Sequence, residues 1–337
     1  MRKTFEPVLE VKNLYSYIPT SKGAITPVNN ISFTIGKGEI VALVGESGSG
    51  KSVTALSIMG LNAPSIKYGK DSVISYKGDN LLKMKKRQLK NIRGNEISMI
   101  FQDPMSSLNP LHPIGKQIAE SIQIHQGVSY KTAKETVIHL LSKVGIPDPE
   151  SRLRDYPHQL SGGMRQRIMI AIALACNPSV LIADEPTTAL DVTIQAQILN
   201  VMRQLQKETN ISILMITHDL GVVAEMADRV LVMYCGEIVE EGNVHSLFQN
   251  PQHPYTKGLL ASVPKLRGAS EKYLHTIPGS VPNPLELPKG CNFYSRCTSG
   301  TEKCLHHTPK LTKTGNQSQA ACWNIVEQQA EEVTVHA

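Results

Sequence analysis

The residues best suited to chemistry lie at 45–52, which read GESGSGKS. This run matches the phosphate-binding pattern G-x-x-x-x-G-K-[ST], and it lies between the apolar segment EIVALV and a helical pattern from about Ser52 to Met59. Glycines allow successive backbone N–H groups to converge on phosphate oxygens, and the helix start adds the positive end of its dipole. Lys51 offers a positive charge to the β and γ phosphates, and Ser52 offers a hydroxyl to Mg²⁺. The run therefore predicts a nucleotide site.

Two acids, Asp184 and Glu185, end a second apolar segment, VLIADEP. A strand that delivers two carboxylates at its end fits a Walker-B arrangement, in which one holds Mg²⁺ and its neighbour orients or deprotonates the attacking water. We assign the metal to Asp184 and the water to Glu185. Two such acids alone could be a surface turn, but beside a phosphate-binding loop they predict nucleotide hydrolysis.

Four cysteines form a third group with chemical potential. Cys291, Cys297, Cys304 and Cys322 follow the pattern C-x5-C-x6-C-x17-C. Four thiolates suit a soft metal site, either tetrahedral zinc or an iron–sulfur cluster. The spacings are wider than the usual zinc C-x2-C pairs, which weighs against zinc, and free thiols remain a further alternative.

A largely parallel sheet is the element expected to position the two nucleotide motifs. Over residues 160–235 helical patterns alternate with apolar segments, which predicts such a sheet, with ligand loops at the carboxyl ends of its strands. Residues 8–44 read as further strands. Between Ile114 and Val144 the apolar residues recur at three- and four-residue spacing, which predicts a helical insert. A basic stretch, LLKMKKRQLKNIRG, is expected to form one exposed helix.

The composition is that of a folded protein with one large domain and an appendage. The chain has 337 residues, of which 41% are hydrophobic and 19% charged, and its net charge is 35 − 29 = +6. Prolines and cysteines gather after Pro251, so we place a boundary near residue 250. The N-terminus has no apolar stretch typical of a secretory signal, and no apolar run reaches the roughly 18 residues of a membrane span. We expect a cytosolic protein that acts on a membrane through partners.

The run LSGGMRQR, Leu160 to Arg167, resembles the signature motif of ATP-binding-cassette (ABC) ATPases, and its spacing to VLIADEP is that of the family. The resemblance implies an α/β fold: a P-loop NTPase of the ABC ATPase type, with a RecA-like core, an antiparallel β subdomain and a helical subdomain. The nucleotide-binding domain is then expected over residues 1–250, with the helical subdomain at about 105–170. In this family Ser161 and Gly163 face the γ-phosphate held by the opposite subunit. Taken alone, LSGG could be a serine-capped helix start.

Other residues match family positions one at a time. Gln102 resembles the Q-loop glutamine that touches Mg²⁺ or water and senses the membrane subunits, and His218 resembles the switch histidine that contacts the γ-phosphate. Asp191 resembles the D-loop residue that couples two ATP sites. Tyr17 most nearly fits the aromatic that stacks on adenine, with Tyr15 as its competitor.

The resemblance thus implies a full set of site residues. The catalytic residues are Lys51, Gln102, Glu185 and His218, and the Mg²⁺ ligands are Ser52, Gln102 and Asp184. The residues expected to contact ATP are Tyr17, Gly45, Glu46, Ser47, Gly48, Ser49, Gly50, Lys51, Ser52, Val53, Gln102, Ser161, Gly162, Gly163, Gln166 and Asp191.

The tail carries a second resemblance. HPYTKGLLASVP at 253–264, then IPGSVPNP and GCNFYSRC, resemble the C-terminal extension of oligopeptide, dipeptide and nickel importer ATPases, which we therefore expect over 251–337. Members of that branch hold a 4Fe–4S cluster on such cysteines, which makes this cluster our expectation, with zinc as the alternative.

That branch also implies the partners. They are two transmembrane permease subunits, a second ABC ATPase that is either a copy or a related chain, and an extracytoplasmic substrate-binding protein. The chain would lie peripherally on the cytoplasmic face of the membrane and import peptides, or alternatively nickel. A cassette ATPase acting on nucleic acid is a weaker alternative, because only about 130 residues, without sustained heptads, separate Ser52 from Asp184. We expect no nucleic-acid partner.

Overall fold

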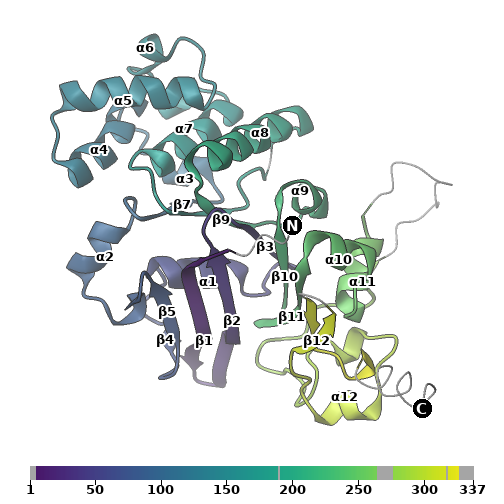
Figure 1. The fold of residues 1–337 in the computed structure, drawn as a ribbon. Coiled ribbons are helices and arrows are strands. Elements are labelled where there is room, and N and C mark those ends of the chain that lie inside the picture. The colour runs from purple at the N-terminus through teal and green to yellow at the C-terminus, as the bar shows by residue number, and fades with distance from the viewer. Residues whose placement is uncertain (1–4, 189, 264–275, 316–317, 326–337) are drawn as a thin grey trace.

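A mixed sheet forms the centre of the protein (Figure 1). We analysed a computed structural model, which describes residues 5–188, 190–263, 276–315 and 318–325. The order of the strands in this sheet is β12-β13-β11-β10-β3-β9-β8-β7. Five neighbouring strands are parallel: β10 (Arg229–Tyr234), β3 (Ile40–Val44), β9 (Ser212–Ile216), β8 (Val180–Asp184) and β7 (Ile97–Ile100). These strands are almost entirely buried, as their continuous apolar sequences predict for a parallel sheet covered on both faces.

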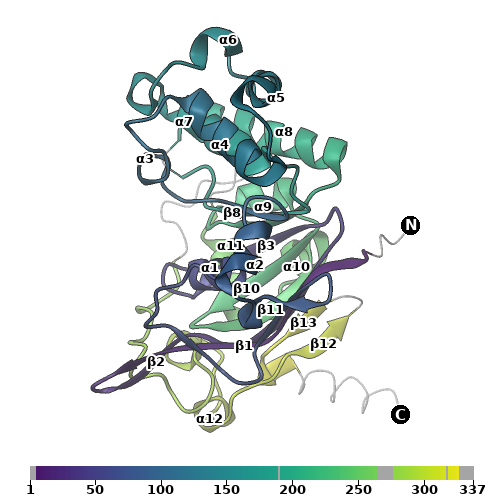
Figure 2. The ribbon, with the colours of Figure 1, turned by 90° about the vertical axis from the view of Figure 1, so that its left-hand side faces the viewer.

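An antiparallel sheet lies beside the first one. Its order is β2-β1-β5-β6, and β4 also pairs with β1. Its strands are β1 (Pro7–Thr20), β2 (Gly23–Gly36), β4 (Lys67–Tyr68), β5 (Val73–Tyr76) and β6 (Asp79–Asn80). Figure 2 shows the long β1–β2 hairpin extending along the lower edge of the molecule. This sheet packs against the main sheet through Leu9, Ile31 and Leu43, which share one core with α1 (Lys51–Met59).

The basic stretch forms two short helices, so the prediction of one helix was wrong. They are η1 (Leu81–Lys83) and α2 (Lys86–Ile92). The Asn80 side chain accepts a hydrogen bond from the N–H of Leu82 and so starts η1, and Met84 is extended, with ψ at 144°. The chain therefore leaves the helical conformation between the two segments.

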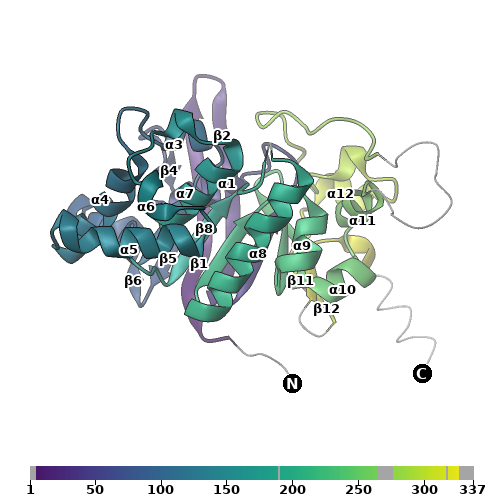
Figure 3. The same cartoon turned by 90° about the horizontal axis from the view of Figure 1, so that it is seen from above.

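A helical layer lies at one end of the sheet (Figures 1 and 3). It contains α3 (Pro104–Ser107), α4 (Ile114–Gln126), α5 (Tyr130–Lys143), α6 (Pro149–Arg152), η2 (Pro157–Gln159) and α7 (Gly162–Leu174). Ile118 of α4 and Val137 of α5 are both fully buried, as the helical spacing of the apolar residues predicts. The same core continues to α8 (Val192–Thr209).

The C-terminal extension continues the main sheet. Its elements follow α9 (Leu220–Met226) and β11 (Glu237–Asn243), and they are α10 (Val244–Gln249), α11 (Pro254–Ala261), η3 (Tyr294–Arg296), α12 (Glu302–His306), β12 (Thr312–Gly315) and β13 (Ser318–Ala320). β13 pairs antiparallel with β11. Phe293 and Tyr255 pack with Tyr234 of β10, with ring centroids 4.6 to 5.4 Å apart. The extension is therefore attached to the nucleotide-binding core by a sheet and by an aromatic cluster.

Candidate nucleotide site

The predicted phosphate-binding loop joins β3 to α1. Gly45 and Gly50 have φ angles of 154° and 105°, which a side chain would strain. A Cβ atom at Gly45 would also meet the carbonyl oxygen of Met233, and one at Gly50 would meet that of Pro27. Both positions therefore require glycine, for conformation and for space.

Lys51 lies at the centre of this loop and is 6% exposed. Its Nζ donates hydrogen bonds to the carbonyl oxygens of Gly45 and Glu46, both at 2.8 Å, and to Oγ of Ser49 at 3.3 Å. Burial lowers the pKa of the ammonium, and the carboxylates of Glu185 and Asp184 oppose that shift. The loop thus places a cation among its own carbonyl groups, where phosphate oxygens would compete for it.

Two of the three residues predicted to hold Mg²⁺ lie side by side, while the third, Gln102, contacts Glu185. Oγ of Ser52, in the first turn of α1, is 3.4 Å from Oδ1 of Asp184 at the end of β8. Burial raises the pKa of Asp184, and the hydrogen bond from Ser52 opposes that rise. A hydroxyl and a buried carboxylate at the end of neighbouring elements are ligands that suit Mg²⁺.

Glu185 is the point at which three side chains meet. Gln102 donates from Nε2 to its Oε2 at 2.9 Å, Thr188 donates from Oγ1 to the same oxygen at 2.9 Å, and Nδ1 of His218 lies 3.3 Å from Oε1. Burial would raise the pKa of Glu185, but the hydrogen bonds from Thr188 and His218 and the charge of Lys51 together lower it. The carboxylate is therefore ionised at neutral pH. The sequence predicted Gln102 and His218 here, and it missed Thr188, whose only signal is its place three residues after Glu185.

The signature residues start a helix. Oγ of Ser161 accepts a hydrogen bond from the N–H of Met164 at 3.3 Å and so caps α7. Ser161 and Gly162 are exposed, and Gly163 packs against Ile194 of α8, whose side chain a Cβ atom would meet at 2.7 Å. Gln166, which was predicted to contact ATP, is only 2% exposed, and its Nε2 has no hydrogen-bond partner within the described residues. The exposed start of α7 presents the hydroxyl and free N–H groups that an anion needs.

Asp191 lies at the start of α8, and the two tyrosines that are candidates for adenine stacking lie on β1. Asp191 caps α8, since its Oδ1 accepts from the N–H of Ile194 at 2.9 Å. Tyr15 and Tyr17 lie on β1 with ring centroids 5.9 Å apart, and both are half-buried. The hydroxyl of Tyr15 is 3.4 Å from Oγ1 of Thr26. The structure places both tyrosines in one region and leaves both as candidates for adenine stacking.

The four cysteines of the extension line one small cavity, together with Phe293 and Trp323. The backbone N–H of Cys291 donates to the carbonyl oxygen of Cys304 at 2.7 Å. Burial raises the pKa of the Cys291 thiol to about 12. Among the described residues, no group of three or more histidine, cysteine, aspartate or glutamate side chains is arranged to hold a metal ion. The topology thus brings the four predicted residues together around one cavity, without a metal-holding arrangement among the described residues.

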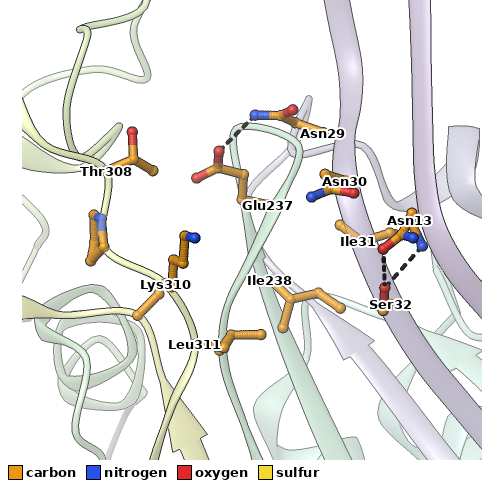
Figure 4. A pocket seen from close by; sticks show the side chains of 12 residues that line it. Asn13, Asn29, Asn30, Ile31, Ser32, Glu237, Ile238, Thr308, Lys310 and Leu311 are labelled. Carbon is orange, nitrogen blue, oxygen red and sulfur yellow. Dashed lines mark hydrogen bonds between the residues drawn. The ribbon is translucent and has the colours of Figure 1, made fainter. Parts of the chain in front are cut away.

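Another cavity, of about 480 Å³, separates the antiparallel sheet from the extension (Figure 4). Asn13, Asn29 and Glu237 are among the residues that line it, and Asn29 donates from Nδ2 to Oε1 of Glu237 at 2.7 Å. None of the predicted nucleotide or cysteine residues lines this cavity.

Sequence reasoning missed two residues of the extension that touch the phosphate-binding loop. Arg296 forms an ion pair with Glu46, with nitrogen–oxygen distances of 2.6 and 3.0 Å. The hydroxyl of Tyr255 accepts a hydrogen bond from the backbone N–H of Glu46 at 2.8 Å. Tyr255 stands in HPYTKGLL and Arg296 stands beside Cys297, but nothing in those runs indicates a partner 209 or 250 residues away in the chain.

Comparison with known families assigns both parts of the chain. The family described as "ABC transporter" matches residues 28–188, and the one described as "Oligopeptide/dipeptide transporter, C-terminal region" matches residues 239–304. The second match thus begins within β11, ahead of the boundary predicted near residue 250. Within the described residues, no helix has the length and apolar character that crossing a membrane requires.

Solved structures share the fold. One is an ATP-binding cassette in a dimeric, post-hydrolysis state bound to ADP and Pi; it is 26% identical, with a TM-score of 0.63, over 70% of this chain and 98% of that chain. Another is cbiO1 from Clostridium perfringens, part of the ABC transporter complex cbiONQ; it is 27% identical, with a TM-score of 0.62, over 73% of this chain and 92% of that one. The predicted α/β ABC ATPase fold is confirmed.

Curated relatives extend over nearly the whole chain. The oligopeptide transport ATP-binding protein AppD of Bacillus subtilis (strain 168) is 51% identical over 325 residues, which cover 96% of this chain and 99% of AppD. The dipeptide transport ATP-binding protein DppD of the same strain is 49% identical over 328 residues, 97% of each chain. The nucleotide-site geometry, the two family matches and this identity agree, and the chain belongs to the ABC transporter family, among the ATP-binding proteins that carry the oligopeptide/dipeptide-type C-terminal region.

Proposed function

We propose that the chain hydrolyses ATP and uses this reaction to drive the uptake of di- or oligopeptides across the cytoplasmic membrane. The observation that carries the proposal is the ionised Glu185, held by Gln102 and His218 beside the Ser52–Asp184 pair. Relatives described as oligopeptide and dipeptide transport ATP-binding proteins support the cargo class.

The chain's own residues divide the work of hydrolysis. Lys51 and N–H groups of the loop at residues 45–52 would bind the phosphates, and Ser52 and Asp184 would hold Mg²⁺, which would supply positive charge against the phosphates. Glu185 accepts the proton of the attacking water, and Gln102 and His218 fix the direction of its carboxylate. Ser161 and Gly163 of a second cassette complete the site from the other side. Tyr17 is our choice for the adenine contact.

The second cassette is either a copy of this chain or a related one. Asp191 and Val192 lie where α8 begins, and Val192 is 83% exposed. The start of α8 is therefore accessible to a second chain, as the D-loop resemblance of Asp191 requires. The dimer is proposed to act on two permease subunits, which receive peptide from an extracytoplasmic binding protein. The chain would then lie on the cytoplasmic face of the membrane.

We assign the helical subdomain, at about residues 105–170, to permease contact. Phe101 and Leu111 are large apolar side chains on either side of its entry, and they are 39% and 80% exposed. Phe101 directly precedes Gln102, which contacts Glu185, so a permease bound here would reach the hydrolytic site through one residue. The nucleotide-binding domain is proposed to span residues 1–250 and the extension residues 251–337.

For the extension we propose a 4Fe–4S cluster on Cys291, Cys297, Cys304 and Cys322. The four cysteines line one small cavity bordered by aromatic rings, so the fold brings all four candidate ligands together. The sequence spacing C-x5-C-x6-C-x17-C, which is wider than the usual zinc C-x2-C pairs, favours the cluster over zinc. The cluster would supply a structural cross-link among these residues.

Metal analysis of protein purified without oxygen tests the cluster. We expect iron and inorganic sulfide in equal amounts with visible absorption, lost in Cys304→Ser and retained in Cys176→Ser, whose thiol lies outside the extension. Colourless protein with stoichiometric zinc would contradict the assignment.

Uptake measurements test the transport function. In cells that lack this chain, the wild-type protein should restore uptake of labelled di- or oligopeptide, whereas Glu185→Gln should not. Uptake of labelled nickel is measured in the same cells for comparison. Uptake of nickel that depends on the chain, with peptide uptake unchanged by its loss, would assign the transporter to metal import instead.

A further inference from the structure

Glu46, the second residue of the phosphate-binding loop, is held at all three of its polar groups. Its carbonyl oxygen accepts from Nζ of Lys51 at 2.8 Å, its backbone N–H donates to the hydroxyl of Tyr255 at 2.8 Å, and its carboxylate binds both terminal nitrogens of Arg296. One of these contacts joins it to the lysine of the site. The other two come from the C-terminal extension.

The extension holds these two side chains rigidly. Tyr255 is fully buried in α11, and its ring packs against Tyr234. Arg296 is 6% exposed, and its Nε donates to the carbonyl oxygen of Pro278 at 3.0 Å. The guanidinium lies 5.9 Å from the ring centroid of Phe293. Neither group can follow Glu46 if the loop moves, so they fix the loop rather than adapt to it.

The chemistry of the contact is specific. A guanidinium that binds a carboxylate through two parallel hydrogen bonds sets distance and orientation together, which a lysine cannot reproduce. The tyrosine hydroxyl satisfies an N–H group that the loop does not satisfy itself. The tyrosine acts on the peptide unit between Gly45 and Glu46, whose carbonyl oxygen also accepts from Lys51. The arginine holds the side chain of Glu46, whose own carbonyl oxygen is the second acceptor for Lys51.

We propose that Arg296 and Tyr255 are positioning residues of the nucleotide site, through which the C-terminal extension holds the phosphate-binding loop and Lys51 in the geometry that binds phosphates. The proposal rests on the nucleotide-binding part of the proposed function. It makes the extension a component of the ATP site, although Arg296 and Tyr255 contact only Glu46 in the loop.

Steady-state ATPase assays of the full-length chain test it, with Tyr255→Phe and Arg296→Lys as variants. We expect KM for ATP to rise by about 5- to 20-fold in each. The kcat should change less than KM does, because Gln102, Glu185 and His218 are untouched and only the position of Lys51 is affected. Arg203→Lys is the matched control, since it weakens an ion pair to Glu225 elsewhere in the protein, and its KM should stay that of the wild type.

Two further measurements separate positioning from general stability. The effects of Glu46→Gln and Arg296→Lys on KM should not add in the double variant, because both remove the same pair. Hydrogen exchange of residues 45–52 should accelerate in Tyr255→Phe, whereas exchange of residues 180–184 should not. Coupling is reciprocal, so ATP should slow exchange of residues 254–261 in the wild type.

The outcomes distinguish the two proposals. Wild-type protein that neither binds nor hydrolyses ATP would overturn the proposed function and this inference with it. Wild-type activity with an unchanged KM in both variants would overturn the inference alone, as would additive effects of Glu46→Gln and Arg296→Lys. Tyr255→Phe removes a single oxygen atom, so it tests the proposal even if Arg296→Lys fails to fold.

Discussion

At the scale of single residues, the hydrolytic site depends on the ionisation of Glu185. This carboxylate is partly buried, which alone would favour its neutral form. Hydrogen bonds from Thr188 and His218 reverse that tendency and keep it charged. The structure thus supplies a base beside the Ser52–Asp184 pair. Its three contacting side chains come from three separate segments of the chain.

Glu185→Gln should bind ATP as the wild type does but hydrolyse it more slowly, by about 10²- to 10⁴-fold. The amide keeps the shape of the side chain and cannot accept the proton of the attacking water. Phosphate release and fluorescent-nucleotide binding measure the two effects separately. Hydrolysis at the wild-type rate would remove Glu185 from the role of base.

Thr188→Val should shift the acid limb of the pH–rate profile to higher pH. The hydroxyl of Thr188 donates to the carboxylate and so favours its charged form; its loss raises the pKa of Glu185. As pH falls, the variant therefore loses the ionised base before the wild type does. The measurement is kcat against pH for both proteins. Coinciding acid limbs would show that Thr188 does not tune the base.

At the scale of elements, His253 explains how α11 begins. Its ring Nδ1 accepts a hydrogen bond from the backbone N–H of Tyr255 at 3.1 Å, and its backbone N–H donates to Oε2 of Glu240 at 2.9 Å. Pro254 follows as the first residue of the helix, a position that suits proline. Histidine and proline together therefore orient Tyr255 toward the core. The start of α11 thus explains the run of His253, Pro254 and Tyr255.

His253 should make stability depend on pH. Burial lowers its pKa to about 3, against about 6.5 in an unfolded chain. Below about pH 6.5, His253 binds a proton in the unfolded chain but not in the folded protein. The free energy of unfolding therefore falls as pH falls, by up to about 1.4 kcal/mol per pH unit. The stability that depends on neutral His253 is fully present above about pH 6.5 and is lost as pH falls towards 3.

Urea unfolding of the wild type and His253→Asn measures this effect. Asparagine can still cap α11 and does not titrate, so the variant should show a shallower loss of stability below neutrality. Glu240 and Lys257, which also act on His253, are present in both proteins, and their own pH dependence cancels in the difference. Parallel stability curves would contradict the assignment.

The sequence predicted most of the elements that hold the nucleotide, for a local reason. β3, α1 and β8 each combine an apolar run with glycines or acids at one end, and such signals lie within a few residues. The basic segment at 81–92 was predicted less well, because polar residues leave the break at Met84 without a periodic signal. Thr188 could be assigned to the site only from its hydrogen bond to Glu185 in the structure.

At the scale of the whole molecule, the extension and the cassette form one unit. β13 continues the main sheet, and Arg296 and Tyr255 reach the phosphate-binding loop. Contacts between residues 209 and 250 positions apart have no signature in either segment, so no reading of the sequence alone supplies them. The family resemblance predicted that an extension exists but not what it contacts.

The central claim is that ATP is gripped by two chains, one through residues 45–52 and the other through Ser161–Gly163. Light scattering of Glu185→Gln, alone and mixed with the related ATPase of its transporter, tests it most directly. With Mg²⁺ and ATP, the mass measured for Glu185→Gln should double to that of a dimer. Introducing Ser161→Arg into the same chain should prevent this doubling. A mass that stays at one chain in both preparations would contradict the account.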